Sequence, residues 1–173
     1  ALLSEAGIDH DTIEKRGFDH GTWVPLSLLY PQADIPVVQL SVQPHLNAAH
    51  HYAIGHALRP LVDENVLIIG TGALTHNLSA LFSREGLLHN REDEEVEWAR
   101  QFADWMSEKV DEGDVGSLLD VFARAPFAVQ NHPTPEHLLP FFVALGASTK
   151  GSGERLHKST EFAVLAMDAF AFH

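Results

Sequence analysis

Cysteine is absent from this sequence of 173 residues. Disulfide bonds, thiolate zinc sites and cysteine nucleophiles are therefore excluded, and the composition fits the reducing cytoplasm, where we expect the protein to act. Long apolar runs are missing as well, because no stretch approaches the roughly 20 residues of a membrane-spanning helix. The first residues lack the basic segment and long apolar stretch of a signal peptide. The chain starts at Ala1 and not at methionine, which indicates a processed or truncated start.

Basic side chains are scarce. Lysine and arginine together number 11 against 24 aspartates and glutamates, which gives a formal net charge of −13. Nucleic-acid backbones and anionic membrane surfaces call for a basic patch, so neither is expected as a partner. Hydrophobic residues make up 45% of the chain, which is enough to bury a core, and no repeat or linker divides it. We therefore expect residues 1–173 to form a single domain.

The hydrophobic pattern predicts an α/β chain. Residues Val37–Val42 are rich in β-branched side chains, which is typical of a strand. Residues Val66–Ile69 form a short apolar run of the kind that is buried on both faces of a parallel sheet. Between them, apolar side chains recur at helical spacing over Asn47–Leu61. The order strand, helix, strand predicts a right-handed βαβ unit, and hence a central, mixed or mostly parallel sheet flanked by helices.

Further elements follow from the same kind of pattern. A short helix is predicted within Trp23–Tyr30, and a long acidic helix over Glu92–Asp111. Two more helices are predicted over Val115–Ala123 and over Thr134–Gly146, the second with Pro135 in its first turn. The apolar stretch Thr160–Phe172 fits either a returning pair of strands or a helix.

Three of the twelve histidines stand in the most constrained local contexts. They are His20 in the turn Gly17–Gly21, His76 beyond the second predicted strand, and His137 after two prolines. Imidazole can bind a metal, move a proton near neutral pH and donate a hydrogen bond to an anion. Four other histidines are interpreted as rim or surface residues: His45, His50, His51 and His56.

His76 follows the apolar run Val66–Ile69 and the glycine-rich turn Gly70–Gly72. Ligands of open α/β sheets bind at the carboxyl ends of the strands, and glycines permit the close approach of a ligand. From its position alone, His76 can be either part of a functional site or a local capping residue, and both alternatives remain open. Phosphate binding is only weakly indicated, because no lysine follows the turn.

His137 ends the segment His132-Pro-Thr-Pro-Glu-His137. A backbone stiffened by two prolines can hold a metal ligand at little entropic cost. The two histidines are five residues apart, which is a poor spacing for two ligands on one helical face, and the segment is not a His-Glu-x-x-His motif. A single metal ligand from this segment is therefore favoured over two. A capping role remains the alternative.

Four sequence blocks resemble those of a known family. They are Asp19–Leu26, Tyr30–Ser41, Gly70–Asn77 and Pro133–Pro140. In this order they resemble the class III extradiol ring-cleaving dioxygenases, specifically the 4,5-DOPA dioxygenase-like branch. The resemblance implies a central sheet flanked by helices, of which this chain is the C-terminal portion. It also implies one mononuclear non-haem metal ion, Fe(II) or Zn(II), in each active site.

An activity and residue roles follow from the resemblance. The expected reaction is the opening of a catechol ring, such as that of DOPA, by O2 next to the two hydroxyls. His137 is expected to bind the metal, and His76 to act as acid/base catalyst or, as in zinc-assigned members, as a second ligand. His20 is expected to be a catalytic residue that faces substrate and oxygen. We also predict that Trp23 and His132, which lie in or beside the same blocks, contact the substrate.

The family's N-terminal part carries two further histidine ligands, and neither of their motifs occurs in these residues. A truncated product, a chain completed by another polypeptide and a remnant without catalytic metal all remain open. An incomplete sheet exposes an edge and an apolar face, so we expect a homo-oligomer or pairing with a chain that supplies the N-terminal part. Two other functions stay open as well: a non-catalytic binding or interaction protein on the same scaffold, and a zinc-dependent hydrolase.

Overall fold

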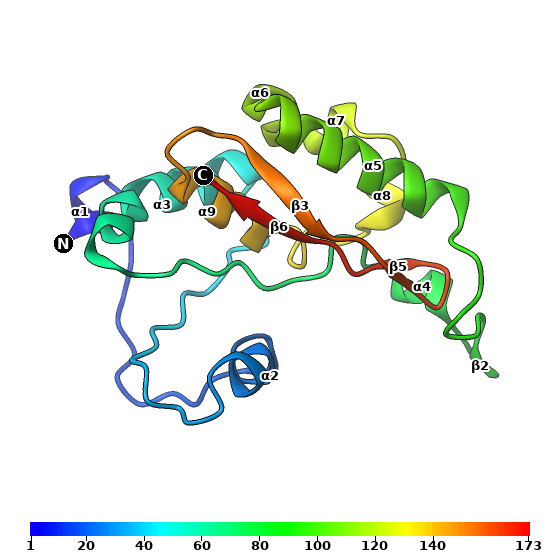
Figure 1. Ribbon diagram of the computed structural model, residues 1–173, viewed down its shortest axis with the longest axis horizontal. Helices are drawn as coiled ribbons and strands as arrows, with labels where there is room; N and C mark the ends of the chain where they lie inside the picture. Colours follow the sequence, from blue (N-terminus) through cyan, green and yellow to red (C-terminus); the bar gives the residue numbers. More distant parts are fainter.

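The computed structural model describes residues 1–173 and combines helices with three small sheets (Figure 1). The helices in chain order are α1 (Leu2–Glu5), α2 (His20–Leu29), α3 (Ala48–Leu58), the 3-10 helix η1 (Arg59–Glu64), α4 (Leu78–Leu81), α5 (Glu97–Glu112), α6 (Val115–Leu119), α7 (Val121–Arg124), α8 (Ala128–Asn131) and α9 (Leu139–Ala147). The strands are β1 (Phe82–Ser83), β2 (Gly86–Leu87), β3 (Gly153–His157), β4 (Thr160–Glu161), β5 (Leu165–Ala166) and β6 (Ala169–Phe172). The predicted α/β class is confirmed. None of the helices is long and apolar enough to cross a membrane.

All strand pairs in the structure are antiparallel, namely β1 with β2, β3 with β6 and β4 with β5. The longest ladder joins β3 to β6, with Gly153 opposite Phe172 and a register shift between Arg155 and His157. The stretch Thr160–Phe172, for which a strand pair and a helix were both open, thus forms strands.

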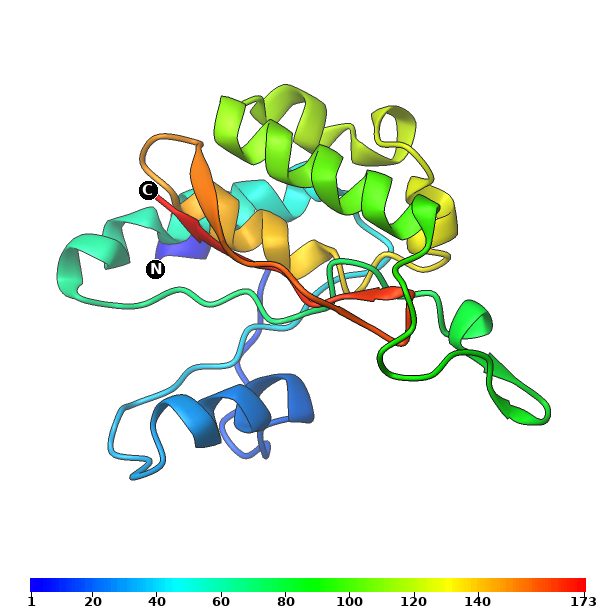
Figure 2. The same ribbon diagram turned by 45° about the vertical axis from the view of Figure 1, so that its right-hand side comes forward.

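Helices α3 and α9 cross in close contact because each has a glycine at the crossing. A β-carbon on Gly55 would stand 2.0 Å from the carbonyl oxygen of Val143, and one on Gly146 would stand 2.1 Å from that of Tyr52. Any larger residue at either position would hold the helices apart. Phe142 of α9 is fully buried in the main hydrophobic cluster. Helix α5 also packs on this cluster, and it lies on the other side of the β3–β6 ladder from α9 (Figure 2).

Helix α5 is amphipathic, and its apolar residues are buried on one face: Ala99, Phe102, Ala103, Met106 and Val110. Gly113 ends it in the left-handed conformation, with φ of 66°, which glycine adopts without steric cost. The predicted helix Glu92–Asp111 is confirmed from Glu97 onwards. It starts later than predicted because the backbone N–H of Val96 donates to the carbonyl of Ala163, in the turn between β4 and β5.

Two further predicted helices form with altered limits. The helix over Asn47–Leu61 is confirmed as α3 followed by η1, and the side chain of Asn47 caps α3 by accepting the N–H of His50. The helix over Val115–Ala123 is confirmed as α6 and α7, which are divided at Asp120.

The two predicted strands Val37–Val42 and Val66–Ile69 have no partner. Both segments lack a ladder, so the predicted βαβ unit and parallel sheet do not form within these residues. The prediction that Val66–Ile69 is buried on both faces is wrong, since Leu67 is 68% exposed, and Val38 in the first segment is 93% exposed. A strand becomes stable only when its backbone pairs with that of neighbours, and no other segment of these residues pairs with either.

Helix α2 stands apart from the remaining helices in both views (Figures 1 and 2) and buries no residue. The predicted short helix within Trp23–Tyr30 is confirmed and begins earlier, at His20. Asp19 caps it, because its Oδ1 accepts the N–H of Thr22 at 3.1 Å. Gln39 holds this cap from the extended segment that follows: its Nε2 donates to Asp19 Oδ2 and its Oε1 accepts from Thr22 Oγ1, both at 2.9 Å.

Candidate metal centre

The segment Leu74–Asn77 is held on both sides of His76. The backbone N–H of His76 donates to the carbonyl oxygen of Asn131 at 2.9 Å. The Nδ2 of Asn77 donates to the carbonyl oxygen of Gln130 at 2.6 Å. Both acceptors belong to α8, which leads into the proline-containing loop. The backbone around His76 is therefore fixed relative to the start of that loop.

A buried threonine anchors the same segment to the C-terminal strands. Thr75 is 0% exposed, and its Oγ1 donates to the carbonyl of Val164 at 2.8 Å and accepts the N–H of Ala166 at 2.7 Å. Its hydroxyl thus satisfies two backbone groups that would otherwise be buried without partners.

Two glycines before His76 let this segment lie against the backbone of the His137 loop. A β-carbon on Gly72 would stand 2.0 Å from the carbonyl oxygen of His137, and one on Gly70 would stand 2.3 Å from that of Pro140. Only glycine fits at such distances. We expected the glycines of this turn to let a ligand approach closely. In the structure they let the backbone of the His137 loop approach instead.

His137 lies in a tight turn and not in the first turn of a helix, as the predicted helix over residues 134–146 required. Helix α9 begins only at Leu139. The carbonyl oxygen of Pro135 accepts the N–H groups of both Leu138 and Leu139, at 2.9 and 3.1 Å, and this closes the turn.

The rings of His76 and His137 are stacked, with centroids 3.4 Å apart and planes inclined by 9°. Glu136 completes a cluster in which one ligand atom from each of the three residues lies within 4.8 Å of the others, and all three residues are partly exposed. The structure thus brings together two of the three predicted histidines. It adds a carboxylate that the sequence did not single out, although its place directly before His137 in a proline-stiffened loop was an available signal.

The charges in this cluster favour a neutral His137 and an ionised Glu136. Burial and the positive charge of His76 and His20 lower the pKa of His137, against the opposite effect of Glu136. Burial acts to raise the pKa of Glu136, yet hydrogen bonds from its own N–H and the Thr134 hydroxyl, with the two histidine charges, bring it below its usual value. Neutral imidazole and carboxylate are the forms that bind a metal.

The donor set fits a divalent metal ion. Two imidazoles and one carboxylate are the ligands of many non-haem Fe(II) sites, and zinc accepts the same donors. The Nδ1 of His137 is buried and has no hydrogen-bond partner in the protein. Because buried polar atoms are normally paired, this nitrogen is open to a partner from outside the protein, which is consistent with a metal-binding role for His137.

His20 approaches the cluster from the start of α2. A β-carbon on Gly21 would stand 3.4 Å from Thr71 Oγ1, so the first turn of α2 lies beside the glycine-rich turn. The His20 residue is exposed, and its charge acts on His137. The third predicted histidine is thus a neighbour of the cluster and not one of its members.

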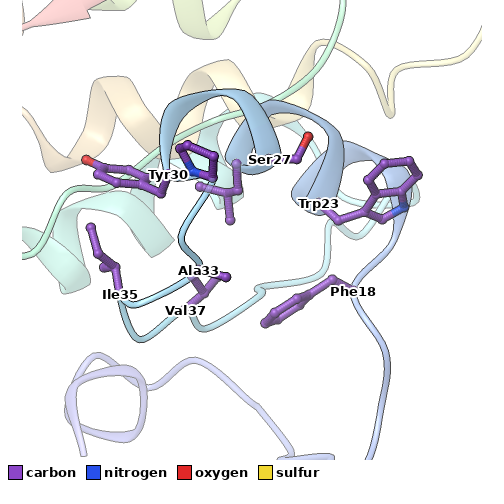
Figure 3. A pocket seen from close by; sticks show the side chains of 9 residues that line it. Phe18, Trp23, Ser27, Tyr30, Ala33, Ile35 and Val37 are labelled. Carbon is purple, nitrogen blue, oxygen red and sulfur yellow. The ribbon is translucent and has the colours of Figure 1, made fainter.

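Trp23 lies in a different place. It is 55% exposed and lines an apolar pocket of about 320 Å³ between α2 and the segment after it (Figure 3). Other residues that line this pocket are Phe18, Leu26, Tyr30 and Ile35. None of the three histidines does so, and the contact of Trp23 with substrate stays a prediction.

His132 is an interior residue. It is 2% exposed, and its Nε2–H donates to the carbonyl oxygen of Leu74 at 2.7 Å. Burial lowers the pKa of His132 from 6.5 to about 4, against the effect of that hydrogen bond. Because the His132 ring is buried and its Nε2–H is bonded within the protein, the structure does not favour the predicted contact between His132 and substrate.

The interpretation of His51 as a rim or surface residue is wrong. The residue is 0% exposed, its Nδ1–H donates to the carbonyl of Asn47 at 2.9 Å, and its Nε2 accepts the N–H of Gln43 at 3.1 Å. Both ring nitrogens are therefore used locally, around the start of α3, and His51 has no part in the cluster.

Comparisons with known proteins identify the family of the chain. A sequence model of the family described as the catalytic LigB subunit of aromatic ring-opening dioxygenase matches residues 1–172. The 4,5-DOPA dioxygenase extradiol of Beta vulgaris is 41% identical over 99% of this chain and 62% of its own length. The protein of the same name from Escherichia coli K12 is 34% identical over 79% of this chain and 49% of its own length.

A solved structure shares the fold. The crystal structure of uncharacterized protein JW3007 from Escherichia coli K12 matches with a TM-score of 0.79 and 29% identity, over 98% of this chain and 68% of that one. The chain thus spans less than the whole of each of these relatives. The resemblance to the class III extradiol dioxygenases is confirmed, and the chain belongs to the family of the catalytic LigB subunit of aromatic ring-opening dioxygenases.

Proposed function

We propose that the protein is an extradiol dioxygenase that opens a single-ring catechol with O2 at one mononuclear metal ion. The observation that carries the proposal is the cluster of His76, Glu136 and His137 in a chain of this family. A DOPA-like catechol is supported as substrate by two relatives of 41% and 40% identity, each named 4,5-DOPA dioxygenase extradiol.

His76, Glu136 and His137 are the proposed ligands from this chain. When bound, the metal ion supplies Lewis acidity that favours ionised catechol hydroxyls and open positions that admit O2. The donors from this chain, two histidines and one carboxylate, suit Fe(II), and Zn(II) is the other cofactor that the resemblance implies. A ring nitrogen of His76 that binds the metal cannot also accept a proton, so its two predicted roles exclude each other at that atom.

Proton transfer is then assigned to His20. Its imidazole is exposed at the start of α2, beside the cluster. An imidazole can accept the proton of a catechol hydroxyl and return it to the ring-opened product near neutral pH. Glu136 remains ionised as a ligand, because the hydrogen bond from Thr134 Oγ1 at 2.9 Å favours its charged form.

The test is oxygen incorporation by the full gene product. The purified protein is loaded with Fe(II) under anaerobic conditions, then supplied with DOPA or catechol and ¹⁸O₂. We expect oxygen uptake and a ring-opened product that carries both atoms of ¹⁸O₂, and His137→Ala should abolish both. A protein that consumes no oxygen with any catechol, yet hydrolyses esters or amides, would instead be the zinc-dependent hydrolase.

We also propose that Val37–Val42 and Val66–Ile69 pair with strands from the part of the family domain that lies outside these residues. Apart from the N–H of Val66, which donates to Leu61, the backbone groups of both segments form no backbone hydrogen bonds. Val66–Ile69 also lines an apolar groove of about 600 Å³, to which β6 and Phe141 of α9 contribute as well. Unpaired strand backbone beside an apolar groove is a template for an added strand.

Hydrogen exchange tests this pairing. The chain is mixed with the separately expressed part of the Beta vulgaris relative that lies outside the match. We expect a one-to-one complex in which the amides of both segments exchange at least about tenfold more slowly. If the same amides are already protected in the chain alone, and light scattering shows a homo-oligomer, self-pairing replaces the proposal. The cytoplasmic location stays a prediction.

A further inference from the structure

We propose that His132 is a positioning residue of the metal centre, which fastens the segment carrying His76 to the loop carrying His137. It acts through the carbonyl of Leu74, two residues before His76. The inference rests on the proposed metal centre and gives a role to a buried histidine whose predicted substrate contact the structure does not favour.

The contact is short, buried and long-range in sequence. The Nε2 of His132 lies 2.7 Å from the carbonyl oxygen of Leu74, 58 residues away in the chain. The ring also packs against Phe102, with centroids 5.6 Å apart. The backbone N–H of His76 donates to the neighbouring residue Asn131 at 2.9 Å. The adjacent residues Asn131 and His132 therefore hold this segment by two hydrogen bonds, one at Leu74 and one at His76. We call this pair of hydrogen bonds the clasp.

The hydrogen bond settles the tautomer of His132. A carbonyl oxygen only accepts, so Nε2 carries the proton and Nδ1 carries the lone pair. That Nδ1 is buried and has no partner in the protein. Since burial also keeps the ring uncharged near neutral pH, His132 can hold the Leu74 carbonyl but has no free N–H with which to serve as an acid.

The clasp acts on the backbone that carries the His76 ring, on the N-terminal side of the ring, whereas Thr75 ties the same segment to the C-terminal strands and Asn77 ties it to α8. The side chains of His76 and His137 meet by stacking alone, at 3.4 Å, and their alignment depends on the backbones that carry them. Gly72 fixes one end of the His76 segment against the His137 loop. His132 fixes the same segment at Leu74, which is nearer to the His76 ring. Outer groups that orient metal ligands typically change metal affinity by about 10–100-fold when removed.

His51 supplies the matched control. It is as buried as His132, and both of its ring nitrogens are hydrogen-bonded, but its partners Asn47 and Gln43 lie far from the cluster in sequence and around the start of another helix. A merely structural role for His132 would make the two histidines equivalent. The comparison is made between His132→Gln, His132→Asn and His51→Gln. Glutamine places an N–H near the position of Nε2, whereas asparagine reaches only to the position of Nδ1.

The readout is Co(II) affinity, followed by the visible absorption of the bound ion. We expect His132→Asn to weaken binding by about 10–100-fold, His132→Gln to recover most of that loss, and His51→Gln to leave the affinity within about threefold of the unsubstituted protein. Equal weakening in His132→Asn and His51→Gln, or no weakening in His132→Asn, overturns the proposal.

A second measurement needs neither metal nor activity. In ¹⁵N-labelled protein, two-dimensional NMR of the histidine rings distinguishes a protonated Nε2 from a protonated Nδ1. We expect His132 as the Nε2–H tautomer, and the Nδ1–H tautomer overturns the inference even if His132→Asn fails to fold. If the unsubstituted protein binds no Co(II), the proposed metal centre falls and with it the role of His132 towards a metal, while the tautomer still shows whether the clasp forms.

Discussion

Gly72 and His137 meet backbone to backbone: a β-carbon on Gly72 would stand 2.0 Å from the carbonyl oxygen of His137. This contact joins the turn before His76 to the loop that carries the other stacked imidazole. A side chain at position 72 must therefore separate the two elements on which the candidate metal centre depends.

Gly72→Ala is expected to lower the free energy of unfolding by about 1–3 kcal/mol, the usual cost of forcing extra atoms into a packed site. Co(II) affinity should fall as well, because His76 and His137 would no longer converge. Urea titration and Co(II) titration measure the two effects. Gly116→Ala is the control, since its β-carbon would meet only Asp114 Oδ1 at 3.7 Å. Similar losses in both variants would contradict the prediction.

A buried ion pair offers a test of stability that changes no proposed metal ligand. The side chain of Asp168 is 1% exposed, and Arg155 Nη1 donates to it at 3.0 Å. Burial raises the pKa of Asp168, although Arg155 opposes that shift. Arg155→Met removes the partner of a buried carboxylate and is expected to lower the free energy of unfolding by about 3 kcal/mol or more.

The exposed pair of Arg124 with Asp120 is the comparison for this change. Both side chains are more than half exposed, so Arg124→Met should cost less than about 1 kcal/mol. Chemical denaturation of the two variants under the same conditions measures the difference. If the two substitutions cost the same, the Asp168 pair does not behave as a buried one.

Stability should fall in acid because of the buried histidines. Burial lowers the pKa of His132 from 6.5 to about 4, and burial also lowers that of His51. The unfolded chain therefore binds protons at a higher pH than the folded one. The contribution is fully present above the unfolded pKa and is lost as the pH falls through the folded pKa. For His132 the loss is on the order of 3 kcal/mol between about pH 6.5 and pH 4.

Urea unfolding at several pH values measures this loss. The free energy of unfolding of His132→Gln should depend less steeply on pH in this window than that of the unsubstituted protein. Parallel curves for the two proteins would mean that His132 is not buried in the neutral form.

The cap of α2 should act locally. Asp19→Ala removes the acceptor for the N–H of Thr22 and the partner of Gln39. Loss of an N-cap side chain usually lowers the stability of its helix by about 1 kcal/mol. Because α2 buries no residue, we expect faster hydrogen exchange in its first turn and little change in global unfolding. Asp19→Asn, which keeps an acceptor oxygen, should exchange more slowly than Asp19→Ala. A cooperative loss of structure beyond α2 would contradict this local role.

The sequence was informative where a pattern is local. The one-sided apolar spacing of α5 predicted that helix, because burial of one face needs only a surface to pack against. The segments Val37–Val42 and Val66–Ile69 have strand composition, yet no ladder forms, because pairing depends on backbone groups elsewhere. Their exposure could not be read from composition.

The candidate site divides in the same way. Motif context predicted His76 and His137, but Glu136 is one of 24 acidic residues, and nothing in its type distinguishes it from the others. The buried rings of His51 and His132 bond to backbone groups, which every residue has, so sequence alone could not assign their partners. The contact of Gly72 with His137 likewise becomes visible only in three dimensions.

Metal binding by the His76–Glu136–His137 cluster is tested most directly by anaerobic titration of the full gene product with Fe(II), with bound metal counted after removal of the excess. We expect one equivalent in the unsubstituted protein and in His10→Ala, which changes an exposed histidine. The affinity should fall at least about tenfold in Glu136→Gln, and binding should be lost in His137→Ala. A protein that binds no metal, or that keeps one equivalent at unchanged affinity in His137→Ala, would contradict the assignment of this cluster as the metal centre.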